Sequence, residues 1–176
     1  MLAILGGALV TPHESDALFA EIGRVVVRWA ELEEAMGAMI ATLLDDYQRY
    51  SRIVGAELGY RSKIDLCVSL YLERHGKDAD FADLKAIFAE IAVVAEERNG
   101  IVHAVWRTAG TPTRVTRIKT TAKQRRGLST SVRNYELGEF TALSERVCEV
   151  QHSLLGFAKR LVASGKGFSN PVSENG

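Results

Sequence analysis

The sequence predicts an all-α (mainly α) protein. The expected architecture is an up-down bundle of four long helices, with a basic β-hairpin or loop inserted between the third and fourth helices. Apolar residues recur at helical spacing along four long stretches, and short connections join these stretches. The segment of residues 113–137 is instead rich in threonine and β-branched residues, as strands are. A chain of 176 residues with 47% hydrophobic residues is long enough for one domain with its own core.

We expect a single folded domain in residues 1–165, followed by a flexible tail in residues 166–176. Residues 1–10 are apolar but lack the basic start and the small-residue cleavage site of a signal peptide. We interpret them as an arm that packs on the domain or on a partner subunit. No stretch approaches the ~18 consecutive apolar residues of a membrane span, so no membrane contact is expected.

The first helix is predicted to begin at Pro12 and to end near Asp46. Thr11 suits the N-cap, proline suits the first helical position, and Glu14 completes a capping box. Its apolar face is formed by Phe19, Ile22, Val26, Trp29, Leu32, Met36, Ile40 and Leu43. We assign Trp29 and the methionines to the core or to a dimer contact, and not to a cofactor site.

Two further helices are predicted after a helical connector at residues 47–58. The second helix covers residues 61–75, and Gly76 is a natural C-terminal stop. The third helix is expected to begin at an aspartate cap, either Asp78 or Asp80. Its apolar positions are Phe81, Leu84, Ile87, Phe88, Ile91, Val94, Ala95, Ile101, Val102 and Val105.

The insertion is predicted to be a β-hairpin, or a loop with strand character, over residues 108–137. A turn is expected at residues 108–112, which contain a glycine and a proline. Strands are expected at residues 113–121 and 129–137, joined by a second turn. The apolar pattern of residues 138–162 then predicts the final helix.

Basic residues are segregated along the chain. It has 22 basic and 22 acidic residues, yet nine of the bases and none of the acids lie between Arg98 and Tyr135. Local charge attracts a charged ligand more than net charge does. We therefore expect the RNA-binding residues in this segment: Arg107, Arg114, Arg117, Lys119, Arg125 and Arg126. The alternative is a solvated arm whose bases pair with acids elsewhere in the fold.

The stretch from Glu97 to His103 combines an arginine, an amide and an imidazole at the end of the third helix. Arg98 carries a permanent charge on a planar fork that suits phosphate. His103 titrates near neutrality and can transfer protons. Asn99 shares a helix face with His103, four residues on, and can orient the imidazole or bind phosphate. No carboxylate, cysteine or histidine cluster has metal-ligand spacing, so we expect neither a metal nor another cofactor.

These residues suit the cleavage of RNA without a metal ion. The 2′-hydroxyl of RNA is the nucleophile, Arg98 stabilises the growing charge, and the products are a 2′,3′-cyclic phosphate and a 5′-hydroxyl. DNA lacks that hydroxyl and is expected to survive. On one helix, Arg98 and His103 diverge by roughly 140°. Two copies about a two-fold axis are needed to bring both groups to one cleft, which predicts a homodimer.

Three motifs together resemble the HEPN superfamily, and within it a bacterial and phage-associated group of HEPN-like proteins. They are Trp-x-x-Leu-Glu at residues 29–33, Lys-Ile-Asp-Leu at residues 63–66, and Glu-Arg-Asn-x-x-x-His-x-x-Trp at residues 97–106. The resemblance covers roughly residues 19–106. It implies a dimeric helical bundle and a metal-independent endoribonuclease in a toxin–antitoxin or phage-defence system. Arg98 and His103 would be its catalytic pair and Asn99 their polar helper, with an antitoxin or other regulatory protein as partner.

One residue departs from the pattern of some toxins in this superfamily. They carry a tyrosine two residues after the histidine, which a nucleotidyltransferase antitoxin modifies. Val105 stands at that position here, so the resemblance does not extend this regulation to the present chain.

Two other functions are compatible with the sequence. A non-catalytic HEPN-like protein would bind nucleotide or RNA without cleaving it, and its binding would weaken steeply with salt. In a dimeric interaction protein, Arg98 would form a surface ion pair and His103 would be a hydrogen-bonded, half-buried histidine. The isolated residues Cys67 and Cys148 lie in helical apolar patterns, which favours reduced thiols in a cytoplasmic protein.

Overall fold

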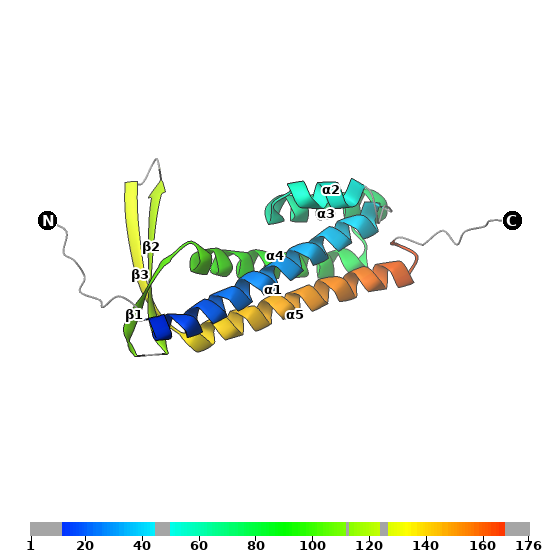
Figure 1. Cartoon of the computed structure of the whole chain (residues 1–176). Helices are drawn as coiled ribbons and strands as arrows, with labels where there is room; N and C mark the ends of the chain where they lie inside the picture. The colour runs from blue at the N-terminus through cyan, green and yellow to red at the C-terminus, as the bar shows by residue number, and fades with distance from the viewer. Residues whose placement is uncertain (1–11, 45–49, 112, 124–126, 168–176) are drawn as a thin grey trace. The chain divides into compact units, whose positions relative to one another are not determined.

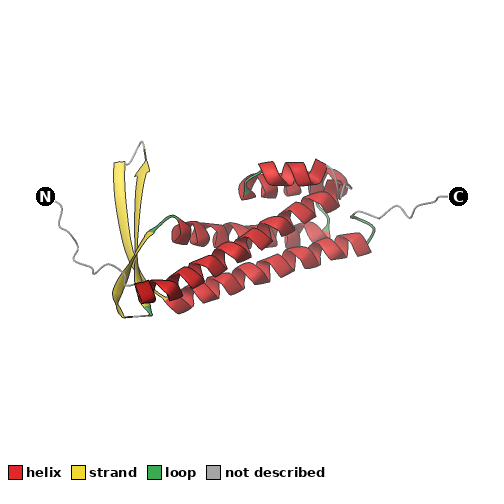
Figure 2. Ribbon diagram, in the orientation of Figure 1, coloured by secondary structure: helices red, strands yellow, loops and turns green. Residues whose placement is uncertain are grey.

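The computed structural model describes residues 12–44, 50–111, 113–123 and 127–167 (Figure 1). Within these residues the chain is mainly helical, and a three-stranded antiparallel sheet follows the fourth of five helices (Figure 2). The elements in order are α1 (Pro12–Leu44), α2 (Tyr50–Glu57), α3 (Tyr60–His75), α4 (Ala79–Val102), β1 (Val105–Thr111), β2 (Arg114–Lys123), β3 (Gly127–Glu136) and α5 (Leu137–Ala163).

The four predicted long helices are confirmed as α1, α3, α4 and α5, and the predicted helical connector is α2. Gly76 ends α3 with a φ of 68°, a conformation that glycine adopts without strain. Asp78 caps α4, because its carboxylate accepts a hydrogen bond from the Phe81 backbone N–H at 3.2 Å. No helix in the described residues is both long and apolar enough to cross a membrane. The predicted N-terminal arm, residues 1–10, lies outside the described residues.

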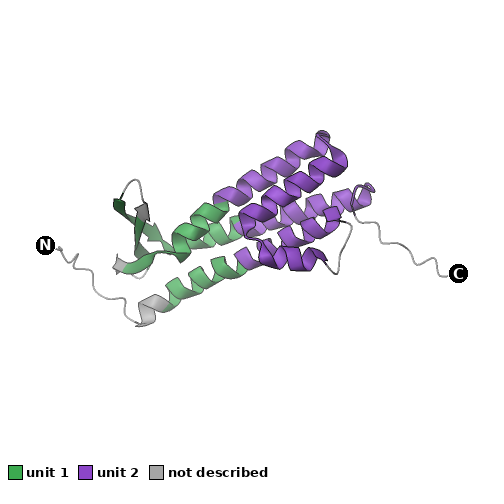
Figure 3. Ribbon diagram, turned by 90° about the horizontal axis from the view of Figure 1, so that it is seen from above, with its two compact units in different colours: residues 1–28, 94–146 green, residues 29–93, 147–176 purple. Residues whose placement is uncertain are grey.

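The chain divides into two compact units, shown in green and purple in Figure 3. Unit 1 comprises residues 1–28 and 94–146, and it contains the start of α1, the end of α4, the sheet and the start of α5. An aromatic cluster joins the sheet to α5: the Trp106 ring lies 5.4 Å from Tyr135 and 5.1 Å from Phe140. The buried apolar residues of unit 1 are Leu18, Val25, Val94, Ala95, Ile101, Val115, Tyr135, Phe140 and Leu143.

Unit 2 comprises residues 29–93 and 147–176 and is entirely helical in its described part. Trp29, Met36 and Met39 are buried there, which confirms them as core residues. Cys67 is also buried, and burial raises the pKa of its thiol to about 12. Cys148 is half-buried, and both cysteines are free thiols, as predicted.

The first half of α1 differs from the prediction. Phe19 and Val26 were expected to face the core, but their side chains are 63% and 38% exposed. Leu18 and Val25, which repeat the same seven-residue spacing one position earlier, are buried instead. Two apolar stripes therefore run side by side along this half of α1, and the core of unit 1 uses only one. The other stripe remains open to solvent.

The sheet has three strands where a two-stranded hairpin was predicted. The predicted strands are confirmed as β2 and β3, which pair along their whole length. The turn predicted at residues 108–112 falls later in the structure, because β1 continues to Thr111 and this residue pairs with Arg114 at the start of β2. Pro112 lies outside the described residues. The pairing of β1 with β2 is irregular between Thr108 and Thr111, so the glycine there disturbs a strand and does not end it. Val105 opens β1 and does not extend the third helix.

A cluster of ion pairs and hydrogen bonds in unit 2 ties the segment after α5 to the start of α4. The Lys166 ammonium donates to Asp78 at 2.6 Å and to Asp80 at 2.7 Å, and the Tyr71 hydroxyl donates to Asp78 at 2.7 Å. The hydrogen bond from Lys166, followed by that from Tyr71, lowers the pKa of Asp78 to about 2. Lys166 is the first residue of the predicted tail; residues 168–176 lie outside the described residues.

This cluster predicts a pH-dependent stability. The pKa of Asp78 is lower in the folded chain than its unfolded value of about 3.9, so its contribution is present above about pH 4 and is lost as the pH falls through about 2. Lys166→Met is expected to lower the Tm at neutral pH. The difference from wild type should shrink as the pH is lowered from about 4 to about 2, because a protonated Asp78 no longer attracts an ammonium group.

Thermal unfolding followed by circular dichroism measures this difference. Lys159→Met removes an exposed lysine from α5 and is the matched control, with an unchanged Tm at every pH. A difference between wild type and Lys166→Met that stays constant over this pH range would contradict the assignment.

Candidate functional site

The motif of residues 97–103 lies in unit 1, at the C-terminal end of α4. The helix continues through Gly100 to Val102, and the His103 backbone N–H still donates to the Asn99 carbonyl at 3.3 Å. The motif is therefore helical, without a break at Gly100. Glu97 anchors its start to α5 through an ion pair with Arg146 at 2.9 Å.

Arg98 and Asn99 are brought together by a direct contact. The guanidinium of Arg98 donates to the side-chain oxygen of Asn99 at 3.0 Å, and both residues are half-buried. The amide thus contacts the arginine, whereas the sequence was interpreted as allowing Asn99 to orient the imidazole or to bind phosphate.

His103 stands just beyond the last residue of α4. Its side chain is exposed, and among the described residues it has no hydrogen-bond or ion-pair partner. The sequence alternative of a hydrogen-bonded, half-buried histidine does not apply to it. An exposed imidazole without a partner is accessible to a ligand from solvent.

Arg117 of β2 also reaches the end of α4. A Cβ atom added to Gly100 would lie only 2.9 Å from the Arg117 Nη1, so the guanidinium packs where a side chain would otherwise be. The same guanidinium lies 5.4 Å from the centre of the Tyr135 ring, a cation–π distance. Its Nε is buried without a hydrogen-bond partner. The negative end of the helix dipole favours a cation at this place.

The sequence did not identify this contact. Gly100 was the available signal, because glycine inside a helix costs about 1 kcal/mol relative to alanine and often marks a close approach. Which side chain approaches it depends on the sheet register, and that register is set by tertiary packing.

Strand alternation divides the predicted RNA-binding residues between the two faces of the sheet. Arg117 is paired with Trp106, and Arg107 with Thr116, in the register of β1 and β2. Successive side chains of a strand point to opposite faces. Arg117 and Lys119 therefore share the face of buried Val115, whereas Arg107 and Arg114 lie on the opposite face.

The basic segment is paired with acids only in part. Arg114 lies 3.6 Å from Glu136, and Arg133 lies 2.7 Å from Glu139 and 4.2 Å from the Tyr135 ring. For these two arginines, the alternative that the basic residues pair with acidic residues of the fold is confirmed. Among the described residues, three further bases have no ion-pair partner: Arg107, Arg117 and Lys119. Arg125 and Arg126 lie outside the described residues.

The last two turns of α4 and the residue after them thus carry Arg98, Asn99 and His103, and Arg117 of β2 packs on the same helix end at Gly100. No group of three or more histidine, cysteine or acidic side chains that could hold a metal ion occurs in the described residues. A guanidinium group suits the binding of a phosphate, and an imidazole can transfer protons. No family model, curated protein or solved structure matches this chain.

Proposed function

We propose that this protein is a dimeric, metal-independent endoribonuclease with an HEPN-like, up-down helical bundle, acting as a toxin or phage-defence effector. One observation carries the proposal. At the end of α4, the exposed imidazole of His103 has no partner among the described residues, and the guanidinium of Arg117, packed on Gly100 of the same helix end, has no ion pair among them. A half-buried guanidinium whose Nε is buried without a partner is costly, which favours an anionic ligand for Arg117.

The open stripe on α1 supports the second copy that the proposal needs. Phe19 and Val26 stand seven residues apart, and Ile22 between them is half-buried. These positions follow the spacing of an apolar helix face, and a face of this kind is normally buried against a partner. It belongs to unit 1, the same unit as Arg98 and His103.

The chemistry uses groups that the chain and the substrate supply. The 2′-oxygen of RNA attacks the neighbouring phosphorus, a 2′,3′-cyclic phosphate forms, and the bond to the 5′-oxygen breaks. His103 takes the proton from the 2′-hydroxyl and returns it to the leaving 5′-oxygen. Arg98 of the other copy stabilises the charge that develops on the phosphoryl oxygens, and Asn99 holds that arginine in position.

The direct test is incubation of RNA with the protein in EDTA. Wild type is expected to cut RNA and to leave a DNA strand of the same sequence intact, and the RNA fragments should end in a 2′,3′-cyclic phosphate. His103→Ala should cut far more slowly. The matched control is His152→Ala, because His152 is an exposed histidine of unit 2. Absence of cleavage by wild type, or equal cleavage by His103→Ala, would refute the enzymatic function.

A second candidate is a protein that binds RNA or nucleotide without cleaving it. Arg107, Arg117 and Lys119 have no ion pair among the described residues, and they favour RNA binding equally whether or not the RNA is cleaved. It predicts salt-sensitive RNA binding with no products in the same incubation. The third candidate, a dimeric interaction protein, predicts that Arg98→Ala lowers stability and leaves RNA affinity unchanged.

A further inference from the structure

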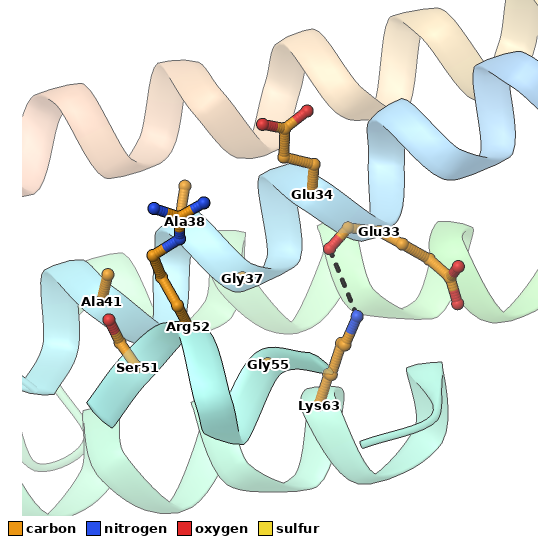
Figure 4. A pocket seen from close by; sticks show the side chains of 9 residues that line it. All are labelled: Glu33, Glu34, Gly37, Ala38, Ala41, Ser51, Arg52, Gly55 and Lys63. Atoms are coloured by element: carbon orange, nitrogen blue, oxygen red, sulfur yellow. Dashed lines mark hydrogen bonds between the residues drawn. The ribbon is translucent and has the colours of Figure 1, made fainter. Parts of the chain in front are cut away.

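Unit 2 contains a pocket of about 550 Å³, far from the motif in sequence (Figure 4). Three elements line it: α1, α2 and the beginning of α3. Four of the lining residues are small: Gly37, Ala38 and Ala41 of α1 and Gly55 of α2. A Cβ atom on Gly55 would lie 3.7 Å from the Gly37 Cα, so the two helices approach closely here. A pocket of this size is in the range of sites that hold small molecules.

Lys63 is the unusual residue of this pocket. It is only 7% exposed, whereas lysines are almost never buried unless they are paired with an acid. Its ammonium group makes one hydrogen bond, to the backbone oxygen of Glu33, at the long distance of 3.5 Å. Among the described residues it has no carboxylate partner. An ammonium group has three donors, so most of its hydrogen-bonding capacity is unused.

The surrounding charges restrict what this ammonium group can bind. Figure 4 shows the Lys63 side chain reaching from α3 toward α1, while the carboxylate of Glu33 points away from the ammonium group. Arg52 of α2 adds a second, exposed cation to the lining. Glu33 and Glu34 add two carboxylates, so the lining carries no net charge. A polyanion such as RNA would meet both carboxylates, whereas one small oxyanion can contact the ammonium group of Lys63 alone.

We propose that this pocket is a binding site for a small molecule with a single oxyanion group, a carboxylate or a phosphate monoester, which Lys63 holds. The rest of the ligand packs against the wall formed by Gly37, Ala38, Ala41 and Gly55. The bound oxyanion supplies the acceptors that the buried ammonium group lacks, and the desolvation of Lys63 is thereby compensated. The site lies wholly in unit 2 and does not depend on the proposed ribonuclease activity.

Two matched pairs of probes test the proposal in the full chain. AMP is compared with adenosine for the phosphate class, and hexanoate with hexanol for the carboxylate class. At least one charged probe is expected to raise the Tm in a saturable way, by about 5 °C at a concentration about 100 times its Kd, and its uncharged counterpart should not. If neither charged probe shifts the Tm, the proposal is wrong.

Lys63→Met assigns the response to the pocket. This variant keeps an unbranched side chain of similar length and should lose at least 10-fold in affinity for the probe. Without a probe, its Tm should equal or exceed that of wild type, because a poorly compensated buried charge has been removed. A Tm well below wild type, or an unchanged affinity, would show that Lys63 has only a structural role and would overturn the proposal.

Two further variants complete the test. Gly37→Leu places a side chain where a Cβ atom meets nothing within 4 Å, so it is expected to fill the pocket and to abolish the response of a folded protein. AMP is also a fragment of RNA, so its binding is measured again in Arg117→Met. A response retained in Arg117→Met supports the pocket, and a response lost there but kept in Lys63→Met contradicts it.

Discussion

A heterodimer of an Arg98→Ala chain and a His103→Ala chain is expected to cleave RNA, although neither homodimer does so efficiently. Each single substitution should reduce the cleavage rate by about 10²–10⁴-fold, the usual contribution of one proton-transfer or charge-stabilising group. In a two-fold dimer each site takes Arg98 from one copy and His103 from the other. One site of the heterodimer is then intact and the other lacks both groups, so about half of the wild-type activity is expected.

Co-expression of the two chains with different affinity tags isolates the heterodimer, and its initial rate of RNA cleavage is compared with those of the three homodimers. The control is a heterodimer in which one chain carries both substitutions and the other is wild type. In that protein each site lacks one group, so no recovery is expected. Recovery in the control but not in the test heterodimer would mean that Arg98 and His103 of the same chain act together.

Phe140→Ala is expected to destabilise the protein by about 3–5 kcal/mol, the range for removal of a buried aromatic ring. Phe140 is completely buried, and its ring centre lies 5.1 Å from that of Trp106 and 5.8 Å from that of Tyr135. These contacts connect α5 to β1 and β3. Because Tyr135 also contacts Arg117 and Arg133, loss of the ring at position 140 is expected to loosen the sheet that carries the basic residues.

Urea unfolding followed by circular dichroism gives the free energy of unfolding for this comparison. Leu128→Ala is the control within the same unit, because Leu128 of β3 is 75% exposed and its removal should change stability by less than about 0.5 kcal/mol. If Phe140→Ala were as mild as Leu128→Ala, the aromatic cluster would not be part of the stabilising core.

The helices could be predicted because their signals are local. The start of α4 depends on a carboxylate at Asp78 that reaches an N–H three residues away, and the end of α3 depends on the conformational freedom of Gly76. The helical spacing of apolar residues then predicts which long segments form helices. Spacing could not select between two adjacent apolar stripes on α1, because the choice between Val25 and Val26 depends on the residues packed opposite.

The strand β1 could not be predicted, because its cause is non-local. Residues 108–112 contain turn-forming residues, but Trp106 is held by distant partners. Its indole N–H donates to the Ile101 carbonyl at 3.0 Å, and its ring packs on Tyr135 and Phe140. Pairing with β2 then extends the strand to Thr111, and the reversal falls between Thr111 and Arg114. Tertiary packing overrides a local preference here.

The position of the candidate site at the end of α4 was predictable, since the motif and the helical spacing are both local. The partners within the site were not. Asn99 contacts Arg98 and not His103, which depends on side-chain rotamers. The approach of Arg117 to Gly100 depends on the pairing register of a sheet that begins after the helix has ended. Residue spacing in the sequence predicts neither of these two contacts.

The basic side chains of β2 point to alternate faces of the sheet, and this affects how strongly salt would weaken RNA binding. A single RNA strand lying along the face of Lys119 and Arg117 would displace counterions there, while Arg107 on the reverse side would keep its own. Ionic strength would then weaken the complex less than a count of bases in the sequence suggests.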